Sequence, residues 1–153
     1  MHPSVVIEFM DPHGNVQANP PGTPVVKVQI GPVKKSDHSY PTGENQAITY
    51  ALIDTGCDCM AIDADLAVEL KMHETGRRDV RGVNHTENSA VHPGFICFAG
   101  TQKVYLTDFV ATPMVKNGRK YTVIIGMEML NKGVLTMDFH RHDYRFSLED
   151  CVN

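Results

Sequence analysis

The stretch best suited to chemistry is Tyr50–Asp63, which reads YALIDTGCDCMAID. An apolar, β-branched run ends in a single carboxylate, Asp54, and Thr55 and Gly56 follow at once. A glycine permits a tight backbone turn that a Cβ would obstruct, and a threonine hydroxyl can fix such a turn by a hydrogen bond. The pattern therefore predicts a carboxylate held at the end of a buried strand, facing a cleft.

A catalytic aspartate of this kind needs a partner. Two carboxylates in contact share one proton, because two like charges cannot both ionise cheaply. One carboxylate then activates water as a base, and the other protonates the amide as an acid. The chain has one Asp-Thr-Gly, and Asp58 and Asp63 lie too close in sequence, on the wrong side of the turn, to be the partner. A symmetric pair of chains would supply Asp54 twice.

The cysteines in the same stretch raise a second possibility, a metal site. Structural zinc favours two cysteines separated by two to four residues plus a second ligand pair, whereas Cys57 and Cys59 are cramped. Alternation along an extended chain would also point the two thiols apart. His73, His85 and His92 could supply further ligands, but no pair of them has a typical spacing. We expect free, buried or half-buried thiols, no metal and no cofactor, with a zinc-binding domain as the weaker alternative.

Composition argues against several other classes of function. The chain has 153 residues, of which 42% are hydrophobic and 21% charged, and this suits one domain with a modest core. The net charge is −4 and the basic clusters are short, so we expect no nucleic-acid partner. No stretch approaches the ~18 apolar residues that span a bilayer, and residues 1–15 do not resemble a signal peptide. We therefore expect no membrane insertion, a cytoplasmic location and reduced cysteines.

The elements that must position Asp54 are mostly strands. Runs rich in Val and Ile, or with alternating polarity, predict strands over residues 5–9, 25–30, 47–54, 103–113 and 118–125, and a final hairpin over 135–148. Residues 1–24 are interpreted as an N-terminal extension, with a strand and a Pro/Gly-rich loop, before a domain over residues 25–153.

Two short helices and one long hairpin complete this outline. After the glycine turn the period changes, which predicts a helix capped by Asp63. A helix of one to two turns should follow Gly126 and end at Gly133. Between the helices, the polar stretch Gly82–Gly94 contains Gly, Pro and Asn and predicts a long hairpin.

Four segments, in this order, resemble the retropepsin family of aspartic proteases: the retroviral and retroelement proteases and their bacterial and eukaryotic relatives. The segments are LIDTG (Leu52–Gly56), the flap-like VRGVNHTENSAVHPG (Val80–Gly94), IIGMEML (Ile124–Leu130) and LTMDF (Leu135–Phe139). The likeness covers about Val25 to Leu148. The order and spacing of four segments are more specific than Asp-Thr-Gly alone.

The resemblance implies a mostly β, single-domain, closed β-barrel with one or two short helices, acting as a C2 homodimer. Asp54 would be the catalytic aspartate, with Thr55 and Gly56 completing the turn and Thr55 bonding across the dimer. A mobile flap around Gly82 would cover the substrate and exclude water. The implied substrate-binding residues are Leu52, Gly82, Val83, Asn84, His85, Ile124, Ile125 and Gly126, and the last three would also pack behind the turn.

The implied activity is that of an acid protease: an aspartic endopeptidase that binds an extended polypeptide across the homodimer. Two positions depart from the family pattern. Cys57 stands where Ala or Ser is usual, and Met127 stands where many members have an arginine that pairs with an aspartate near the first turn. Asp58 then needs another partner, such as an arginine of residues 77–81. The alternative function is a non-catalytic, dimeric retropepsin-like module for peptide binding or assembly, because a fold does not guarantee its chemistry.

Overall fold

The structure, a computed structural model, describes residues 4–82 and 84–148 and is mostly β. Its strands are β1 (Ser4–Val6), β2 (Glu8–Met10), β3 (Val16–Gln17), β4 (Thr23–Pro32), β5 (Ala47–Ile53), β6 (Met60–Asp63), β7 (Gly76–Arg81), β8 (Thr86–Phe98), β9 (Val104–Thr112), β10 (Val123–Ile125), β11 (Gly133–Asp138) and β12 (Asp143–Leu148). Its helices are α1 (Ala64–Glu69), α2 (Met127–Leu130) and the 3₁₀ turn η1 (Val115–Asn117).

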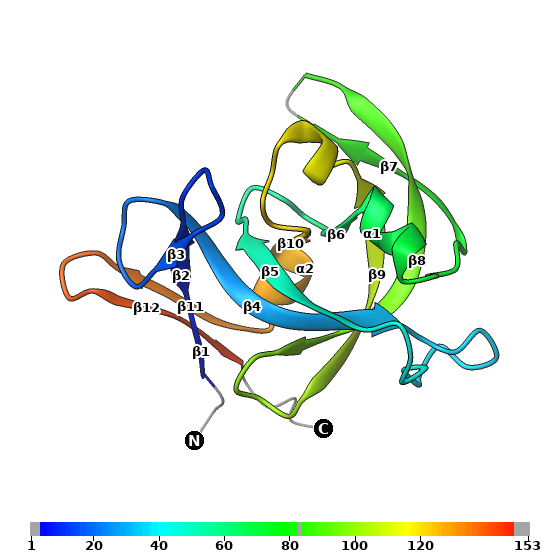
Figure 1. Cartoon of the computed structure of the whole chain (residues 1–153), viewed down its shortest axis with the longest axis horizontal. Coiled ribbons are helices and arrows are strands. Elements are labelled where there is room, and N and C mark those ends of the chain that lie inside the picture. The colour runs from blue at the N-terminus through cyan, green and yellow to red at the C-terminus, as the bar shows by residue number, and fades with distance from the viewer. Residues whose placement is uncertain (1–3, 83, 149–153) are drawn as a thin grey trace.

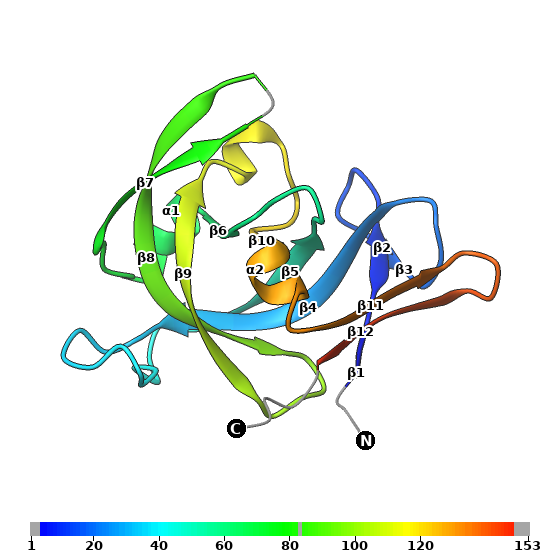
Figure 2. The ribbon, with the colours of Figure 1, turned by 180° about the vertical axis from the view of Figure 1, so that it is seen from behind.

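The larger sheet closes on itself. Its hydrogen-bonded order runs β4-β5-β10-β6-β9-β8, and β8 then pairs back to β4. Figures 1 and 2 show the barrel from its two sides, with the β7–β8 hairpin reaching beyond one end and the β11–β12 hairpin beyond another. The expectation of a mostly β, closed barrel with two short helices is confirmed.

The core fills the barrel and the space beneath its neighbouring strands. The largest fully buried side chains are Phe9, Phe98, Phe109, Phe146, Ile7, Ile30, Met60, Ile62, Ile96, Ile125, Met129 and Leu148. Burial of each such side chain contributes about 1.5–3 kcal/mol relative to exposure. Because β6 is buried throughout and β5 and β10 end in the buried Ile53 and Ile125, the chain segments that follow these strands begin from fixed positions.

The N-terminal strands belong to the same core. β1 pairs with β12 in a small sheet, whereas β2 pairs with β4 of the barrel sheet. The two strands divide at Ile7, whose N–H donates to the carbonyl of Tyr144 at 3.1 Å, so the single strand predicted over residues 5–9 serves two sheets. Phe9 packs edge-on against the Tyr144 ring at 4.8 Å between centroids. The boundary placed between residues 24 and 25 falls inside β4, within one continuous core.

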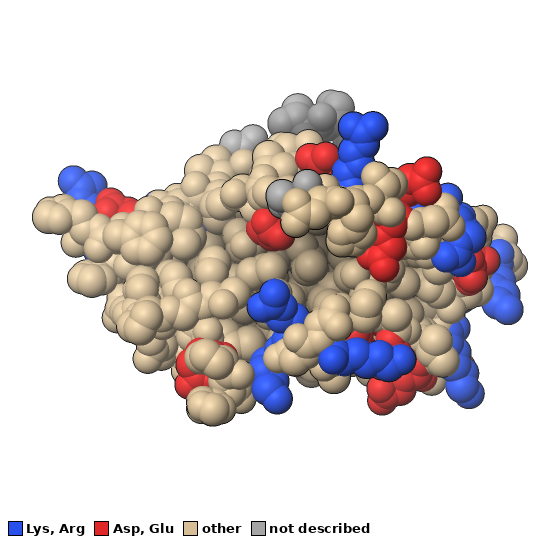
Figure 3. All heavy atoms as spheres, turned by 90° about the horizontal axis from the view of Figure 1, so that it is seen from above, with Lys and Arg blue, Asp and Glu red and all other residues tan. Residues whose placement is uncertain are grey.

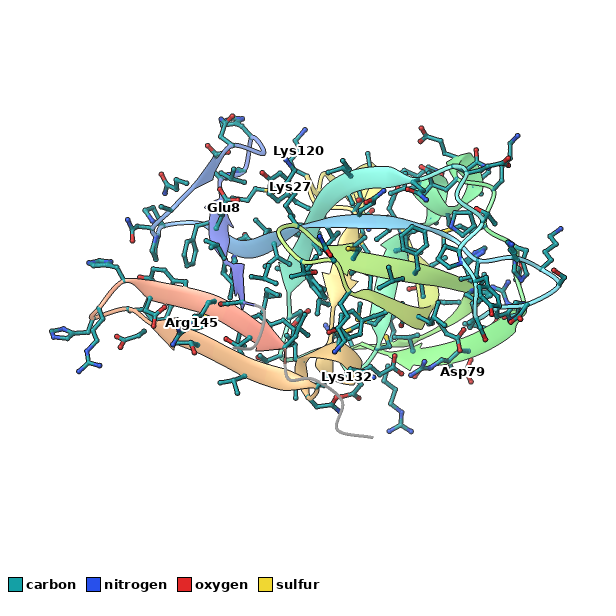
Figure 4. The ribbon with its side chains drawn as sticks, turned by 90° about the horizontal axis from the view of Figure 1, so that it is seen from below. Glu8, Lys27, Asp79, Lys120, Lys132 and Arg145 are labelled. Atoms are coloured by element: carbon teal, nitrogen blue, oxygen red, sulfur yellow. The ribbon has the colours of Figure 1, made fainter. Side chains whose placement is uncertain are left out.

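Opposite ends of the molecule carry different parts of the chain. Figure 4 shows Glu8 on β2 and Arg145 on β12 at one end, and Asp79 on β7 toward the other. The barrel lies between these ends, so the N-terminal strands are far from the β7–β8 hairpin. Within the described ranges 4–82 and 84–148, no helix has the length and apolarity to cross a membrane.

The predicted start of α1 is confirmed, whereas the predicted end of α2 is wrong. Asp63 caps α1, because its Oδ2 accepts a hydrogen bond from the Leu66 N–H at 3.2 Å. α2 follows Gly126 as expected but ends at the cap residue Asn131. The expectation that Gly133 ends this helix is wrong, since Gly133 begins β11. A Cβ there would lie 2.2 Å from the Ser147 carbonyl of β12, so close strand packing requires glycine.

The predicted hairpin over Gly82–Gly94 has a shorter turn than the polar sequence indicates. Gly82 donates its N–H to the His85 carbonyl at 2.7 Å, and β8 begins directly afterwards at Thr86. Polar residues at the start of β8 pair in register with β7, for example Asn88 with Asp79. Polarity here marks solvent exposure on a hairpin arm, and most of the predicted loop is strand.

Candidate active site

Asp54 lies where two central parallel strands end together. β5 runs parallel to β10, with Ile53 opposite Ile125. The Asp54 N–H donates to the Ile125 carbonyl at 3.0 Å, which extends the ladder by one residue past the end of β5. Ile53 and Ile125 are buried, and Asp54 itself is half-buried. The strand pair therefore delivers the carboxylate to the surface from a rigid base.

The next two residues fold the chain into a tight turn around the carboxylate. Asp54 Oδ1 accepts the Gly56 N–H at 2.9 Å, and the Asp54 carbonyl accepts the Cys57 N–H at 3.3 Å. A Cβ on Gly56 would lie 3.3 Å from the same Oδ1, which favours glycine. Thr55 is exposed, and its hydroxyl makes no hydrogen bond to another residue of the described chain. The turn thus fixes Asp54 and leaves the Thr55 hydroxyl available.

A second chain segment braces the turn from behind. The N–H groups at the start of α2 donate to the carbonyls beyond the turn: Met127 to Cys57 at 2.7 Å, and Glu128 to Asp58 at 2.9 Å. A Cβ on Gly126 would lie 2.2 Å from the Cys59 carbonyl oxygen and 2.5 Å from that of Cys57. Only glycine permits this approach, so Gly126 fixes the distance between the two segments.

The implied substrate residues of β5 and β10 separate into two groups. Ile125 and Gly126 are buried and support the turn from inside. Leu52 and Ile124 face each other in the strand register and are half-buried, so part of each apolar side chain reaches the surface.

A cleft of about 290 Å³ opens beside the turn. Its lining residues are Asp54, Gly56, Cys57, Asp58 and Cys59 on one side and Arg78, Asp79, Val80 and Arg81 of β7 on the other. The hairpin residues Gly82, Asn84 and His85 are exposed and lie beyond this lining, and Val83 lies outside the described residues. The hairpin therefore contributes the part of β7 next to its turn, and none of the described residues of the turn itself, to the cleft of a single chain.

The β7 segment was not recognised as a cleft wall from the sequence. Its signal was the arginine-rich run directly before the flap-like stretch. Arg78 pairs with Glu128 of α2 at 3.2 Å, and Arg77 pairs with Glu74 at 3.2 Å. Among the described residues, no arginine of residues 77–81 forms an ion pair with Asp58, so that prediction is wrong. Seen from above, basic and acidic side chains are interspersed on this face (Figure 3).

The two cysteines face each other, contrary to the expectation from strand alternation. Their Sγ atoms lie 3.7 Å apart, and the Cys57 thiol also lies 3.3 Å from the Cys59 carbonyl as a donor. The chain bends at Asp58 and Cys59 before β6 begins, so alternation does not apply. The thiol of Cys59, as a hydrogen-bond donor, lowers the pKa of Cys57 to about 7, and the same contact raises the pKa of Cys59.

The histidines considered as further ligands lie elsewhere. His73 Nε2 lies 3.0 Å from His38 Nε2, and His92 Nδ1 lies 3.2 Å from the Met72 carbonyl. Within residues 4–82 and 84–148, no three side chains of His, Cys, Asp or Glu form a group that could hold a metal ion.

Asp63 has a larger role than the sequence predicted. In addition to capping α1, its Oδ1 accepts the N–H groups of Met114 and Val115 at 2.9 Å and 3.2 Å. The side chain is 2% exposed, so three donors converge on a buried carboxylate. Asp63 therefore connects α1 to the segment after β9, and it is occupied away from the cleft.

Comparison with models of known protein families and with curated proteins finds no match to this chain. The geometry of the site is then the guide to its chemistry. That geometry is a cleft with one braced carboxylate on one wall and a β-hairpin arm on the other.

Proposed function

We propose that this chain is a retropepsin-like aspartic endopeptidase that acts as a homodimer. Two Asp54 carboxylates, one from each subunit, would activate the water that attacks a peptide bond. The observation that carries this proposal is the double brace of the Asp-Thr-Gly turn: β10 holds Asp54 at its N–H, and α2 holds the carbonyls of Cys57 and Asp58. Such pre-positioning is what proton transfer at a reacting centre requires.

The surroundings of the other carboxylates near Asp54 support a homodimer. Asp79, on the opposite wall of the cleft, accepts a hydrogen bond from Asn88 Nδ2 at 2.9 Å. Asp63 is buried and accepts three backbone N–H groups, so it cannot be the second member of a pair. Asp58 lines the cleft but follows the turn, on its far side from β5. A C2 axis beside Asp54 would bring the second Asp54 into contact with the first. The exposed Thr55 hydroxyl, free within the described chain, is suited to a contact across that axis.

The chemistry then assigns one proton to the aspartate pair. The ionised member takes a proton from water, and the protonated member gives its proton to the amide. Activity is expected at acid to mildly acidic pH, because the shared proton is lost as pH rises. The polypeptide substrate would lie extended, with the half-exposed Leu52 and Ile124 contacting its apolar side chains. The β7–β8 hairpin, with Gly82 and His85 at its turn, would close over it.

The first experiment is cleavage of a mixed peptide library by the wild type and by Asp54→Asn, from acid to neutral pH. Loss of the ionisable group should reduce the cleavage rate by about 10³-fold or more, because general acid–base catalysis typically contributes about 10²- to 10⁴-fold. Asp58→Asn is the matched control, since it removes a carboxylate from the same cleft and should keep most activity. Sedimentation should give a dimer for all three proteins.

Two results would contradict the proposal. Equal cleavage by wild type and Asp54→Asn would mean a contaminant or a different site. If the wild type is folded and dimeric but cleaves none of the peptides, the result would favour the alternative, a peptide-binding or assembly module.

A further inference from the structure

The thiol pair beside the aspartate turn has no part in the proposed hydrolysis. Cys57 is half-buried and lines the cleft, so a small solute reaches its sulfur. Cys59 is 4% exposed, and its sulfur lies 3.7 Å from that of Cys57. One thiol is therefore partly exposed in the cleft, and the other is buried beside it. This is the arrangement in which an oxidised thiol can be resolved by its neighbour.

The surroundings favour the thiolate on Cys57. Donation by the Cys59 thiol stabilises the charged sulfur and lowers its pKa from the ordinary 9.0 to about 7, although burial and the charges of Asp54 and Asp58 act in the opposite direction. The charge of Arg78, across the cleft, acts on Cys59 by lowering its pKa, against the larger effects of Cys57 and burial. The thiolate is the nucleophilic form of cysteine.

We propose that Cys57 and Cys59 form a modification site for hydroperoxides, in which Cys57 is oxidised first and Cys59 then closes a disulfide. The probe of this chemistry is hydrogen peroxide. The Cys57–Cys59 reaction concerns the thiols alone, whereas its effect on cleavage rests on the proposed function.

The chemistry balances in two steps. The Cys57 thiolate attacks one oxygen of the peroxide, the O–O bond breaks, and the leaving hydroxide takes up a proton as water; sulfur is oxidised to the sulfenic acid and the peroxide is reduced. The Cys59 sulfur then attacks the Cys57 sulfur, an S–S bond forms, the S–O bond breaks, and the hydroxide leaves with the Cys59 proton as water. Two thiols and one peroxide thus give one disulfide and two waters.

Disulfide formation would alter the brace behind Asp54. The sulfurs are 3.7 Å apart, and a disulfide needs about 2.05 Å, so residues 57–59 must contract. The same residues supply the carbonyl that accepts the Met127 N–H and the surface against which Gly126 packs. Because neither contact tolerates a large shift, oxidation should move the turn and reduce cleavage by about 10-fold or more, as misplacement of catalytic groups does. A dithiol reductant should restore the activity.

The test is a peptide map of the folded full chain after peroxide treatment and alkylation. Trypsin releases residues 36–71 as one peptide that contains Cys57 and Cys59 and neither of the other cysteines. In the oxidised wild type, this peptide should lack two hydrogen atoms and carry no alkyl group, until a reductant is added. Cys97→Ser is the matched control and should behave as the wild type does. Cys57→Ser should prevent the cross-link, and Cys59→Ser should leave a sulfenic acid that dimedone captures.

A second measurement uses pH and does not depend on hydrolysis. The alkylation rate of Cys57 should rise with pH through a midpoint near 7 in the native protein. Cys59→Ala removes the donor, so this midpoint should move upward toward the ordinary value. An unchanged midpoint in Cys59→Ala would show that the thiols do not interact.

The outcomes separate this proposal from the proposed function. Cross-linking of peptide 36–71 in a protein with no proteolytic activity would support the thiol site and count against the protease. Proteolysis in a protein whose peptide 36–71 remains alkylated on both cysteines after peroxide would overturn the thiol site alone. Disulfides formed between two chains, in place of the Cys57–Cys59 bond, would also overturn it.

Discussion

The aspartate turn and the β7–β8 hairpin form the two walls of one cleft, but they are built in opposite ways. The turn is held by hydrogen bonds from two other segments, β10 and α2, and by a backbone approach that only Gly126 permits. The hairpin extends beyond the barrel, and its described residues from Arg81 to Asn88 are exposed. One wall is positioned by the core, and the other is held by its own strand ladder.

β8 shows where this difference begins. Its residues from Thr86 to Asn88 are exposed, whereas those from His92 to Ile96 are buried where β8 passes into the barrel. The same strand therefore anchors the hairpin at one end and leaves it in solvent at the other. Local opening is easiest where buried apolar contacts are few, so the hairpin can move without loss of the turn. This division gives a rigid wall that carries Asp54 and a second wall that is freer to move.

The largest expected effect on stability comes from Gly126→Ala. The new Cβ would meet two backbone carbonyl oxygens, at 2.2 Å and 2.5 Å, and backbone cannot rotate away as a side chain can. We expect a loss of about 3 kcal/mol or more, at the upper end for overpacking. Urea denaturation measures it. Gly76→Ala, at the start of the hairpin, is the control, because no atom lies within 4 Å of its Cβ position, and it should change stability by less than about 0.5 kcal/mol.

Equal losses for the two glycine variants would remove the distinction between the walls. If Gly126→Ala were neutral, the turn would not be braced by close packing. Its cleavage activity would then also stay unchanged, in contrast to the loss expected from a displaced Asp54.

Asp63→Ala should have the next largest effect. It removes one helix cap and leaves the buried N–H of Met114 without its acceptor. Loss of a cap costs about 1 kcal/mol and a buried unsatisfied donor about 1–3 kcal/mol, so we expect about 2–4 kcal/mol. The control is Asp65→Ala, which breaks only the exposed pair with Lys116. That control should lose less than about 1 kcal/mol in the same denaturation experiment.

The comparison also shows what a sequence can and cannot predict. A strand with one buried face, such as β12, follows from alternation alone. β6 was not separated from the helix after it, because all four of its residues are buried and give no period. The Asp54 turn was predictable, because its residues are adjacent in sequence. Its glycine, Gly56, is favoured by a contact with Asp54, only two positions away. These features depend on neighbours along the chain.

The predictions about Cys57 and about the partner of Asp58 were wrong because they concern contacts between segments that are distant in sequence. The orientation of Cys57 toward Cys59 depends on a bend that α2 stabilises from about seventy residues further along, through the Met127 and Glu128 N–H groups. The pairing of Arg78 with Glu128 joins residues 50 positions apart, and no local pattern indicates it. Long-range geometry decides which of several possible partners a charged or polar side chain meets. The sequence therefore predicted the Asp-Thr-Gly turn, but it did not predict which segments line the cleft around it.

The smallest effect tests the one ion pair that joins the two walls among the described residues. Arg78 of β7 and Glu128 of α2 are 3.2 Å apart, with side chains 40% and 42% exposed. Exposed pairs contribute about 0.2–1 kcal/mol and weaken with salt. Glu128→Gln should therefore change global stability by less than about 1 kcal/mol, and less again at high salt. Glu74→Gln breaks the pair of Arg77 with Glu74, which does not reach α2, and serves as the control.

Hydrogen exchange should be more sensitive to this pair than denaturation. If the pair limits the movement of the hairpin, Glu128→Gln should increase exchange of amides in β7 and the start of β8, while amides of β5 and β10 keep their protection. Glu74→Gln should leave exchange at the cleft end of β7 unchanged. An increase spread equally over both walls would mean that they open as one unit, and the contrast between a braced turn and a separately moving hairpin would then be wrong.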